Sequence, residues 1–182
     1  EGTLTVRPVR GELKRTVCSR GGRVHFYWRD CLDGSHIDQC VAALMAATGG
    51  VGRTTNPYLD ADNQAKYETT LKKAQRGNLR PGDHVKTVTM DPAVDLFELR
   101  WNDVQVVPVN PVTGLVGNKT SVQVRLYYVE SGEAWVVGLY THEKQIGDSA
   151  EETTRLQDAH IRAALAYEAS ARADRWNVPE LQ

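Results

Sequence analysis

Three strand-like segments carry side chains that could act together on a phosphate group. They are DLFELRW at 95–101, SVQVRLYYVE at 121–130 and AWVVGLYTHEKQ at 134–145. Because successive side chains of a strand point to opposite faces, the polar side chains of each segment share one face. If these faces coincide in one sheet, the patch contains Glu98, Arg100, Arg125, Tyr127, Tyr140, His142 and Lys144. The arginines could then stabilise a phosphorane while His, Tyr or Lys moves protons, without a metal ion.

The same pattern has a simpler interpretation. A sheet with one face in a core turns polar residues toward water on the other face, where Glu98 and Arg125 would form a cross-strand ion pair. Spacing alone favours this solvated face over a catalytic site. On either interpretation, the opposite face is expected to carry Phe97, Leu99, Trp101, Val124, Leu126, Tyr128, Val137 and Leu139.

The surrounding periodicity predicts an α+β fold, a small antiparallel sheet packed against helices. Apolar residues recur at helical spacing in 35–48, 58–76 and 150–175, whereas alternation predicts strands at 23–29, 95–101, 122–130 and 134–142. HVKTVTM and VQVVPV are further strand-like segments, and ESGE at 130–133 is typical of a hairpin turn. We therefore expect a basic arm or hairpin at 1–22, one domain at 23–176 with an inserted excursion near 102–121, and a tail at 177–182.

Composition indicates an ordinary globular protein. The chain has 182 residues, 41% of them hydrophobic and 25% charged, and no stretch resembles a membrane span or a signal peptide. We therefore expect a soluble, cytoplasmic protein without a membrane partner. Cys18, Cys31 and Cys40 are odd in number and form no C-x-x-C pair, which predicts free thiols. The first residue is Glu, which suggests that some N-terminal sequence is missing.

Charge is unevenly distributed along the chain. The net charge is −1, but residues 1–29 hold seven Lys/Arg against two Asp/Glu, while residues 81–182 hold nine against fifteen. A cluster of cations at the start could contact a phosphate backbone. A solvated cationic hairpin would explain the same composition equally well.

No metal or cofactor site is expected. The five His are scattered without H-x-x-H or H-E-x-x-H spacing, and the cysteines are equally dispersed. The Gly-rich stretch TGGVGRTTN at 48–56 follows a predicted helix and lacks a Lys-Ser/Thr pair, so it is interpreted as a turn rather than a phosphate-binding loop.

The order of these segments resembles the RelE/HigB-like toxins of toxin–antitoxin systems, including their phage-derived relatives. The resemblance rests on FYWRDCLDGS before a helix, a helix ending in GNLRPGD, then LFELRW, VRLYYVE, WVVGLYTHEKQ and a terminal IRAALAYEASAR, and it covers about 23–172. It implies a small antiparallel sheet packed on helices. It also implies metal-independent cleavage of mRNA on the ribosome, by attack of a ribose 2′-hydroxyl on the adjacent phosphate.

The resemblance assigns roles to residues by position. Arg100 matches the arginine of the ELR strand and Arg125 that of the next strand, while His142 and Lys144 match the basic end of the last strand. Tyr127 and Tyr140 are possible supporting phenols. The implied partners are a cognate antitoxin protein, mRNA and the ribosome, and no cofactor is implied.

A second function remains open beside the ribonuclease. The near-neutral charge and the sequence HEKQ, where Glu143 separates two basic residues, differ from the usual basic pattern. These features favour a non-catalytic, phage-encoded binding protein that keeps a toxin-like fold and grips a host protein through its basic leader or the 102–121 excursion. The ordered ELRW, VRLYY and LYTHEK motifs favour the endoribonuclease, which is the leading hypothesis.

Overall fold

A computed structural model describes residues 15–130 and 134–182 of the chain. Within these residues the elements follow one another as η1 (Val17–Ser19), β1 (His25–Trp28), α1 (His36–Thr48), β2 (Arg53–Thr54), α2 (Pro57–Gln75), β3 (Val85–Val88), β4 (Leu96–Pro108), β5 (Thr120–Glu130), β6 (Trp135–Glu143), α3 (Ala150–Ala171), η2 (Arg175–Asn177) and η3 (Pro179–Leu181). The predicted α+β class is confirmed. The expected hairpin at 1–22 and the ESGE turn lie largely outside the described residues.

The strands form a mixed but mostly antiparallel sheet. Its order is β1-β6-β5-β4-β2, and β3 pairs with the other end of β4. The β4–β5 and β5–β6 pairs are antiparallel, as expected. The predicted antiparallel sheet is thus confirmed for most of its strand pairs, while at one edge β1 runs parallel to β6. A parallel neighbour requires a long connection, which α1, α2 and the central strands supply.

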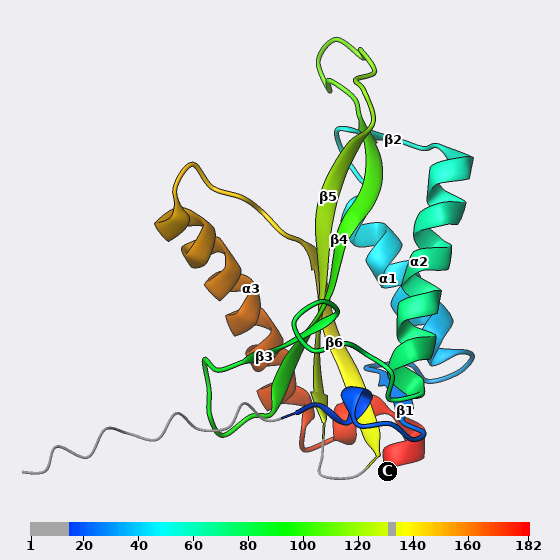
Figure 1. The fold of residues 1–182 in the computed structure, drawn as a ribbon, viewed down its shortest axis with the longest axis vertical. Coiled ribbons are helices and arrows are strands. Elements are labelled where there is room, and N and C mark those ends of the chain that lie inside the picture. The colour runs from blue at the N-terminus through cyan, green and yellow to red at the C-terminus, as the bar shows by residue number, and fades with distance from the viewer. Residues whose placement is uncertain (1–14, 131–133) are drawn as a thin grey trace, which may run out of the picture.

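Helices cover both faces of this sheet (Figure 1). On one face, α1 and α2 bury a cluster that includes Leu44, Leu71, Phe97 and Leu126. On the other, α3 and the C-terminal residues bury a second cluster, which includes Tyr127 and Ile161. The face that carries the candidate catalytic residues is therefore not a solvated surface.

The helices begin where the sequence offers side-chain caps. The side chains of Ser35, Asn56 and Ser149 each accept a hydrogen bond from a backbone N–H in the first turn of the helix that follows. Pro57 occupies the first position of α2, where its missing N–H costs nothing. α3 ends at Ala171 rather than near 175.

Two expected boundaries differ from the structure. Residues 102–108 and 120–121 extend β4 and β5, so the excursion shrinks to a loop at 109–119 that projects beyond the helices (Figure 1). The segment 177–182, expected as a tail, packs against the body of the protein. Val178 is completely buried, and the carboxylate of Glu180 lies 3.1 Å from His36 Nε2.

Candidate functional site

Strand register brings the predicted site residues together on one face of the sheet. Arg100 on β4 lies opposite Arg125 on β5, which lies opposite His142 on β6. One row further along, Glu98, Tyr127 and Tyr140 face one another in the same way. We call this set, with Lys144, the polar cluster.

A β-bulge in β6 allows this alignment. Tyr127 pairs with Tyr140 while Tyr128 pairs with Gly138, so β6 holds one extra residue, Leu139, at this point. On the other side of the bulge, the residues of β6 that face α3 are the odd-numbered ones. Val137 therefore pairs with Val129 and belongs to the same buried cluster as Tyr127. The expectation that Val137 and Leu139 lie opposite the polar residues is therefore wrong, because both belong to the cluster under α3.

The centre of the polar cluster is a buried ion-pair network. Glu98 Oε1 lies 3.2 Å from Arg125 Nε and 3.1 Å from Arg100 Nε. Glu98 and Arg125 are each only 1% exposed. The predicted Glu98–Arg125 pair is thus present, but it is buried rather than solvated as expected, because α3 covers this face.

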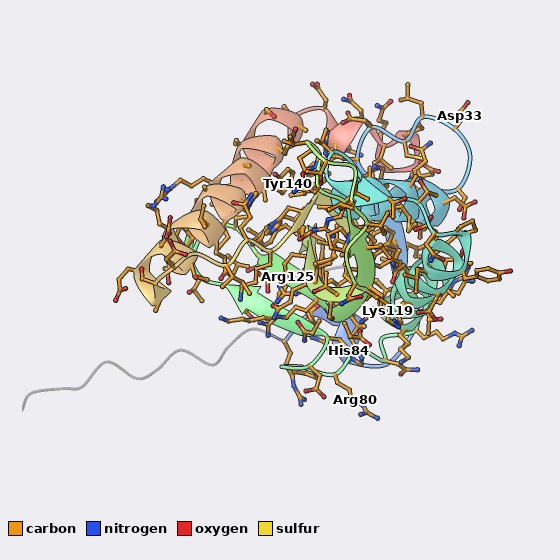
Figure 2. All side chains as sticks on the ribbon, turned by 90° about the horizontal axis from the view of Figure 1, so that it is seen from above. Asp33, Arg80, His84, Lys119, Arg125 and Tyr140 are labelled. Atoms are coloured by element: carbon orange, nitrogen blue, oxygen red, sulfur yellow. The ribbon has the colours of Figure 1, made fainter. Side chains whose placement is uncertain are left out.

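The other two nitrogens of the Arg125 guanidinium also have protein acceptors. Its Nη1 donates to the carbonyl oxygens of Val124 at 2.9 Å and Trp101 at 3.3 Å, and its Nη2 donates to Gln123 Oε1 at 2.6 Å. Burial lowers the pKa of Arg125, while Glu98 opposes this shift. Figure 2 shows Arg125 in the interior, whereas Arg80 and His84 lie at the periphery.

α3 adds two polar residues that were not among the predicted site residues. Gln157 Nε2 donates to Glu98 Oε2 at 3.1 Å, and Tyr140 Oη lies 3.1 Å from His160 Nδ1. The rings of His142 and His160 are stacked, with centroids 3.8 Å apart. The spacing of Gln157 and His160 could have indicated their position. They lie three residues apart and so share a face of the helix, and His160 is next to Ile161, which faces inward.

His142 is held in a neutral form with one free nitrogen. Its Nδ1 lies 3.0 Å from the carbonyl oxygen of Glu143, an acceptor that requires a proton on Nδ1. The other nitrogen, Nε2, is buried and has no hydrogen-bond partner among the described residues. Burial, together with the neighbouring His160, lowers the pKa of His142 to about 4. An unprotonated Nε2 has the lone pair that a general base needs.

Two phenols border this imidazole. The rings of Tyr127 and Tyr140 stack on His142 with centroids 5.5 and 5.9 Å away. Burial raises the pKa of both hydroxyls, and the Glu98 carboxylate adds to the shift at Tyr127. Both phenols are therefore neutral at ordinary pH, so they are potential hydrogen-bond donors.

Cations line the open rim of the polar cluster. Arg100 and Lys144 are half-buried, and Lys86 lies opposite Glu98 on β3 and is exposed. Burial lowers the pKa of Lys144, and the positive charges of Arg125 and Arg100 lower it further. Lys86 was not among the predicted site residues, although it also alternates with apolar residues in HVKTVTM.

Glu143, which interrupts the basic end of β6, does not face this rim. Its carboxylate pairs with Arg53 Nη2 at 2.9 Å, and its neighbour His142 points to the polar cluster. Since adjacent strand residues point to opposite faces, the HEKQ sequence leaves the cluster's charge largely undisturbed.

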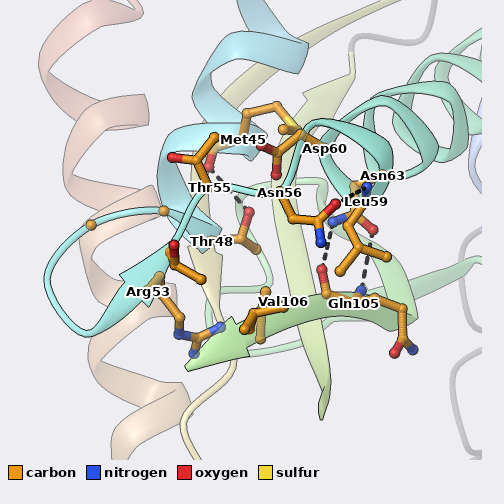
Figure 3. A pocket seen from close by; sticks show the side chains of 14 residues that line it. Met45, Thr48, Arg53, Thr55, Asn56, Leu59, Asp60, Asn63, Gln105 and Val106 are labelled. Carbon is orange, nitrogen blue, oxygen red and sulfur yellow. Dashed lines mark hydrogen bonds between the residues drawn. The ribbon is translucent and has the colours of Figure 1, made fainter. Parts of the chain in front are cut away.

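A separate small polar hollow lies between the end of α1 and the start of α2 (Figure 3). The Gly-rich turn forms one wall, and Asn63 fixes the other by exchanging two hydrogen bonds with the backbone of Gln105, at 2.7 and 3.2 Å. The predicted turn at 48–56 is present, with Gly50 and Gly52 at positive φ. Its role here is to lead from α1 into the short strand β2.

Comparisons with protein families, with curated proteins and with solved structures found no match to this chain. Across residues 15–130 and 134–182, no His, Cys, Asp and Glu side chains gather in a group of three or more that could hold a metal ion. No helix in the same part of the chain is both long and apolar enough to cross a membrane.

Proposed function

We propose that the protein is a metal-independent endoribonuclease of the RelE/HigB-like type that cuts translated mRNA at the ribosome. The observation that supports this proposal is the row Arg100, Arg125 and His142 across three adjacent strands, where His142 Nε2 has no hydrogen-bond partner in the described part of the chain. A ribosomal substrate implies a cytoplasmic protein, and the proposed inhibitor is a cognate antitoxin that covers the cationic rim.

The proposed reaction uses these groups as follows. His142 Nε2 takes the proton of a ribose 2′-hydroxyl, whose oxygen bonds to the adjacent phosphorus as the bond from phosphorus to the 5′-oxygen breaks. Lys144 protonates the leaving 5′-oxygen, a role suited to its lowered pKa. Arg100 and Arg125 stabilise the extra negative charge on the phosphorane. The products carry a 2′,3′-cyclic phosphate and a 5′-hydroxyl.

Access to His142 is the main requirement of this reaction. The residue His142 is 6% exposed, and the ring of His160 is stacked on its imidazole. A ribose can reach Nε2 only if this part of α3 moves away from β6. The substrate would meet Lys86, Arg100 and Lys144 first, because these cations are at the rim.

Two observations favour a second function, a non-catalytic module that binds a protein. Contacts with protein oxygens already use four of the five N–H groups of the Arg125 guanidinium, so a phosphate would have to compete with them for this buried group. In addition, the loop at 109–119 exposes Val112, Leu115 and Val116 to 90%, 71% and 65% at the end of the β4–β5 hairpin. Such a projecting apolar tip is typical of a protein-binding surface.

Induced expression in bacteria separates the two functions. A ribonuclease should arrest growth and shorten transcripts within minutes, and Arg100→Ala should abolish both effects, since loss of one charge-stabilising group costs about a hundredfold or more in rate. Arg100 is preferred to Arg125 because its side chain is 25% exposed and its removal disturbs the core less. Lys119→Ala in the projecting loop is the matched control.

The opposite result would support the binding module. Growth arrest that persists in Arg100→Ala with intact mRNA, and disappears in Leu115→Asp, would assign the effect to a protein partner at the projecting loop.

A further inference from the structure

A second cationic surface lies at the edge of the sheet, far from the polar cluster. It is a hollow of about 650 Å³ between β1 and the last turns of α2, and its walls include Arg23, His25, Tyr27, His36, Lys72 and Arg76. His25 pairs with Trp135 at the start of β6, seven residues before His142. At about 3.3 Å per residue, the two sites are roughly 23 Å apart.

The backbone places two arginines from different elements at this hollow. Val24 N donates to the Gln75 carbonyl at 2.8 Å, and Gly21 N donates to the Gly77 carbonyl at 3.0 Å. A Cβ at position 77 would come within 2.7 Å of the Gly21 backbone, so this close approach requires glycine. The segment that carries Arg23 is thereby fixed against the end of α2, which carries Arg76.

These cations are only partly neutralised. Among the described residues, neither Arg23 nor Arg76 has an ion-pair partner, and both are exposed. Lys72 pairs with Glu68 at 3.0 Å, but a surface pair of this kind contributes little and gives way to a stronger anion. Lys72 lies in the last turn of α2, where it also complements the helix dipole. The dipole does not explain Arg23, which belongs to the segment before β1.

Aromatic and imidazole rings lie beside the cations. His25 and Tyr27 alternate on β1 and share a face, with nearly parallel rings 6.4 Å apart. His36 meets Tyr27 edge-on at 5.1 Å, and its Nε2 lies 3.1 Å from the Glu180 carboxylate. The ring of His25 is exposed, so one further planar group can stack there.

We infer that this hollow binds single-stranded RNA, with backbone phosphates on Arg23, Lys72 and Arg76 and one base stacked beside His25 and Tyr27. Each nucleotide of a single-stranded nucleic acid carries both a phosphate charge and a base that can stack, whereas the acidic side chains of a peptide supply only the negative charge. The inference goes beyond the proposed cleavage, because binding here uses no catalytic group and holds for either function.

The test is a direct binding measurement on the full chain. Fluorescence anisotropy with a short fluorescein-labelled oligouridylate, over a series of KCl concentrations, gives the dissociation constant and its salt dependence. Three phosphate contacts predict a slope of about −2 in the logarithm of affinity against the logarithm of salt. Arg23→Ala combined with Arg76→Ala should weaken binding about tenfold or more and make the slope shallower by about 1.4.

Matched variants make the result specific. Arg155→Ala with Arg162→Ala removes the same charge from the exposed face of α3 and should leave affinity and slope almost unchanged. His25→Ala should weaken binding about fivefold or more without changing the slope, since it removes stacking rather than charge. Thermal melts of each variant confirm that these exposed substitutions leave the fold intact.

Three results would overturn the inference. They are no saturable binding by the wild-type protein at low salt, equal losses in the α3 control, or unchanged binding after loss of Arg23 and Arg76. Competition by inorganic tripolyphosphate as strong as that by unlabelled oligouridylate, with no effect of His25→Ala, would overturn the assignment to RNA.

Discussion

Replacing Glu98 by alanine should destabilise the fold strongly, because this carboxylate is the counter-charge that Arg100 and Arg125 share. Glu98 is 1% exposed and lies 3.1–3.2 Å from Arg100 Nε and Arg125 Nε. Its removal leaves the buried guanidinium of Arg125 without a counter-charge. Breaking a buried ion pair from one side costs about 3–5 kcal/mol. For a chain of this size that corresponds to a fall of about 6–20 °C in melting temperature.

Urea unfolding followed by tryptophan fluorescence measures this cost. The control is Glu68→Ala, which removes the partner of Lys72 at the surface and should change the stability little. Glu98→Leu combined with Arg125→Met removes both charges and should recover most of the loss. A Glu98→Ala variant within about 1 kcal/mol of wild type would show that the network is more solvated than its geometry indicates.

Three further predictions concern buried groups outside this ion pair. Because folding lowers the pKa of His142 to about 4, the unfolded chain binds a proton at this imidazole at a higher pH than the folded protein does. The free energy of unfolding should therefore decrease by about 3 kcal/mol from pH ~6.5 to ~4. The decrease should be smaller in His142→Gln, and unfolding at a series of pH values measures both. Burial raises the pKa of Cys18 to about 12 and that of Cys40 well above its usual range, so a disulfide reagent should label both thiols only in denaturant. A Cβ at position 138 would lie 2.8 Å from the ring of Trp28, so Gly138→Ala should cost about 1–3 kcal/mol in a thermal melt.

Periodicity predicted most of the elements that position the site. The strands carrying Arg100, Arg125 and His142 lie in segments that were predicted as strands, and the three long helices have apolar stripes with capping residues before them. The parallel pairing of β1 could not be predicted, because both edges of a sheet accept a strand and no turn joins β1 to β6. The bulge at Leu139 also has no sequence mark, since it depends on how β6 matches β5.

Burial of the polar cluster was the larger surprise. The prediction assumed that one face of the sheet meets water, whereas α3 covers it. One signal was present in β5, where Leu126 to Val129 are four consecutive apolar or aromatic residues, all buried. Such a run is typical of a strand enclosed on both faces. The identity of the covering residues, Gln157 and His160, depends on the rotation of α3, which sequence leaves open.

Mapping of mRNA ends in a cell-free translation reaction tests the central claim most directly. With wild-type protein, we expect new 5′-hydroxyl ends on ribosome-bound mRNA, and none where the scissile nucleotide carries a 2′-deoxyribose, because the 2′-hydroxyl is the proposed nucleophile. Arg100→Ala should reduce the yield of these ends about a hundredfold, while Lys119→Ala retains it. Intact mRNA with folded wild-type protein, or equal cleavage of the 2′-deoxy substrate, would contradict the proposed catalytic role of the polar cluster.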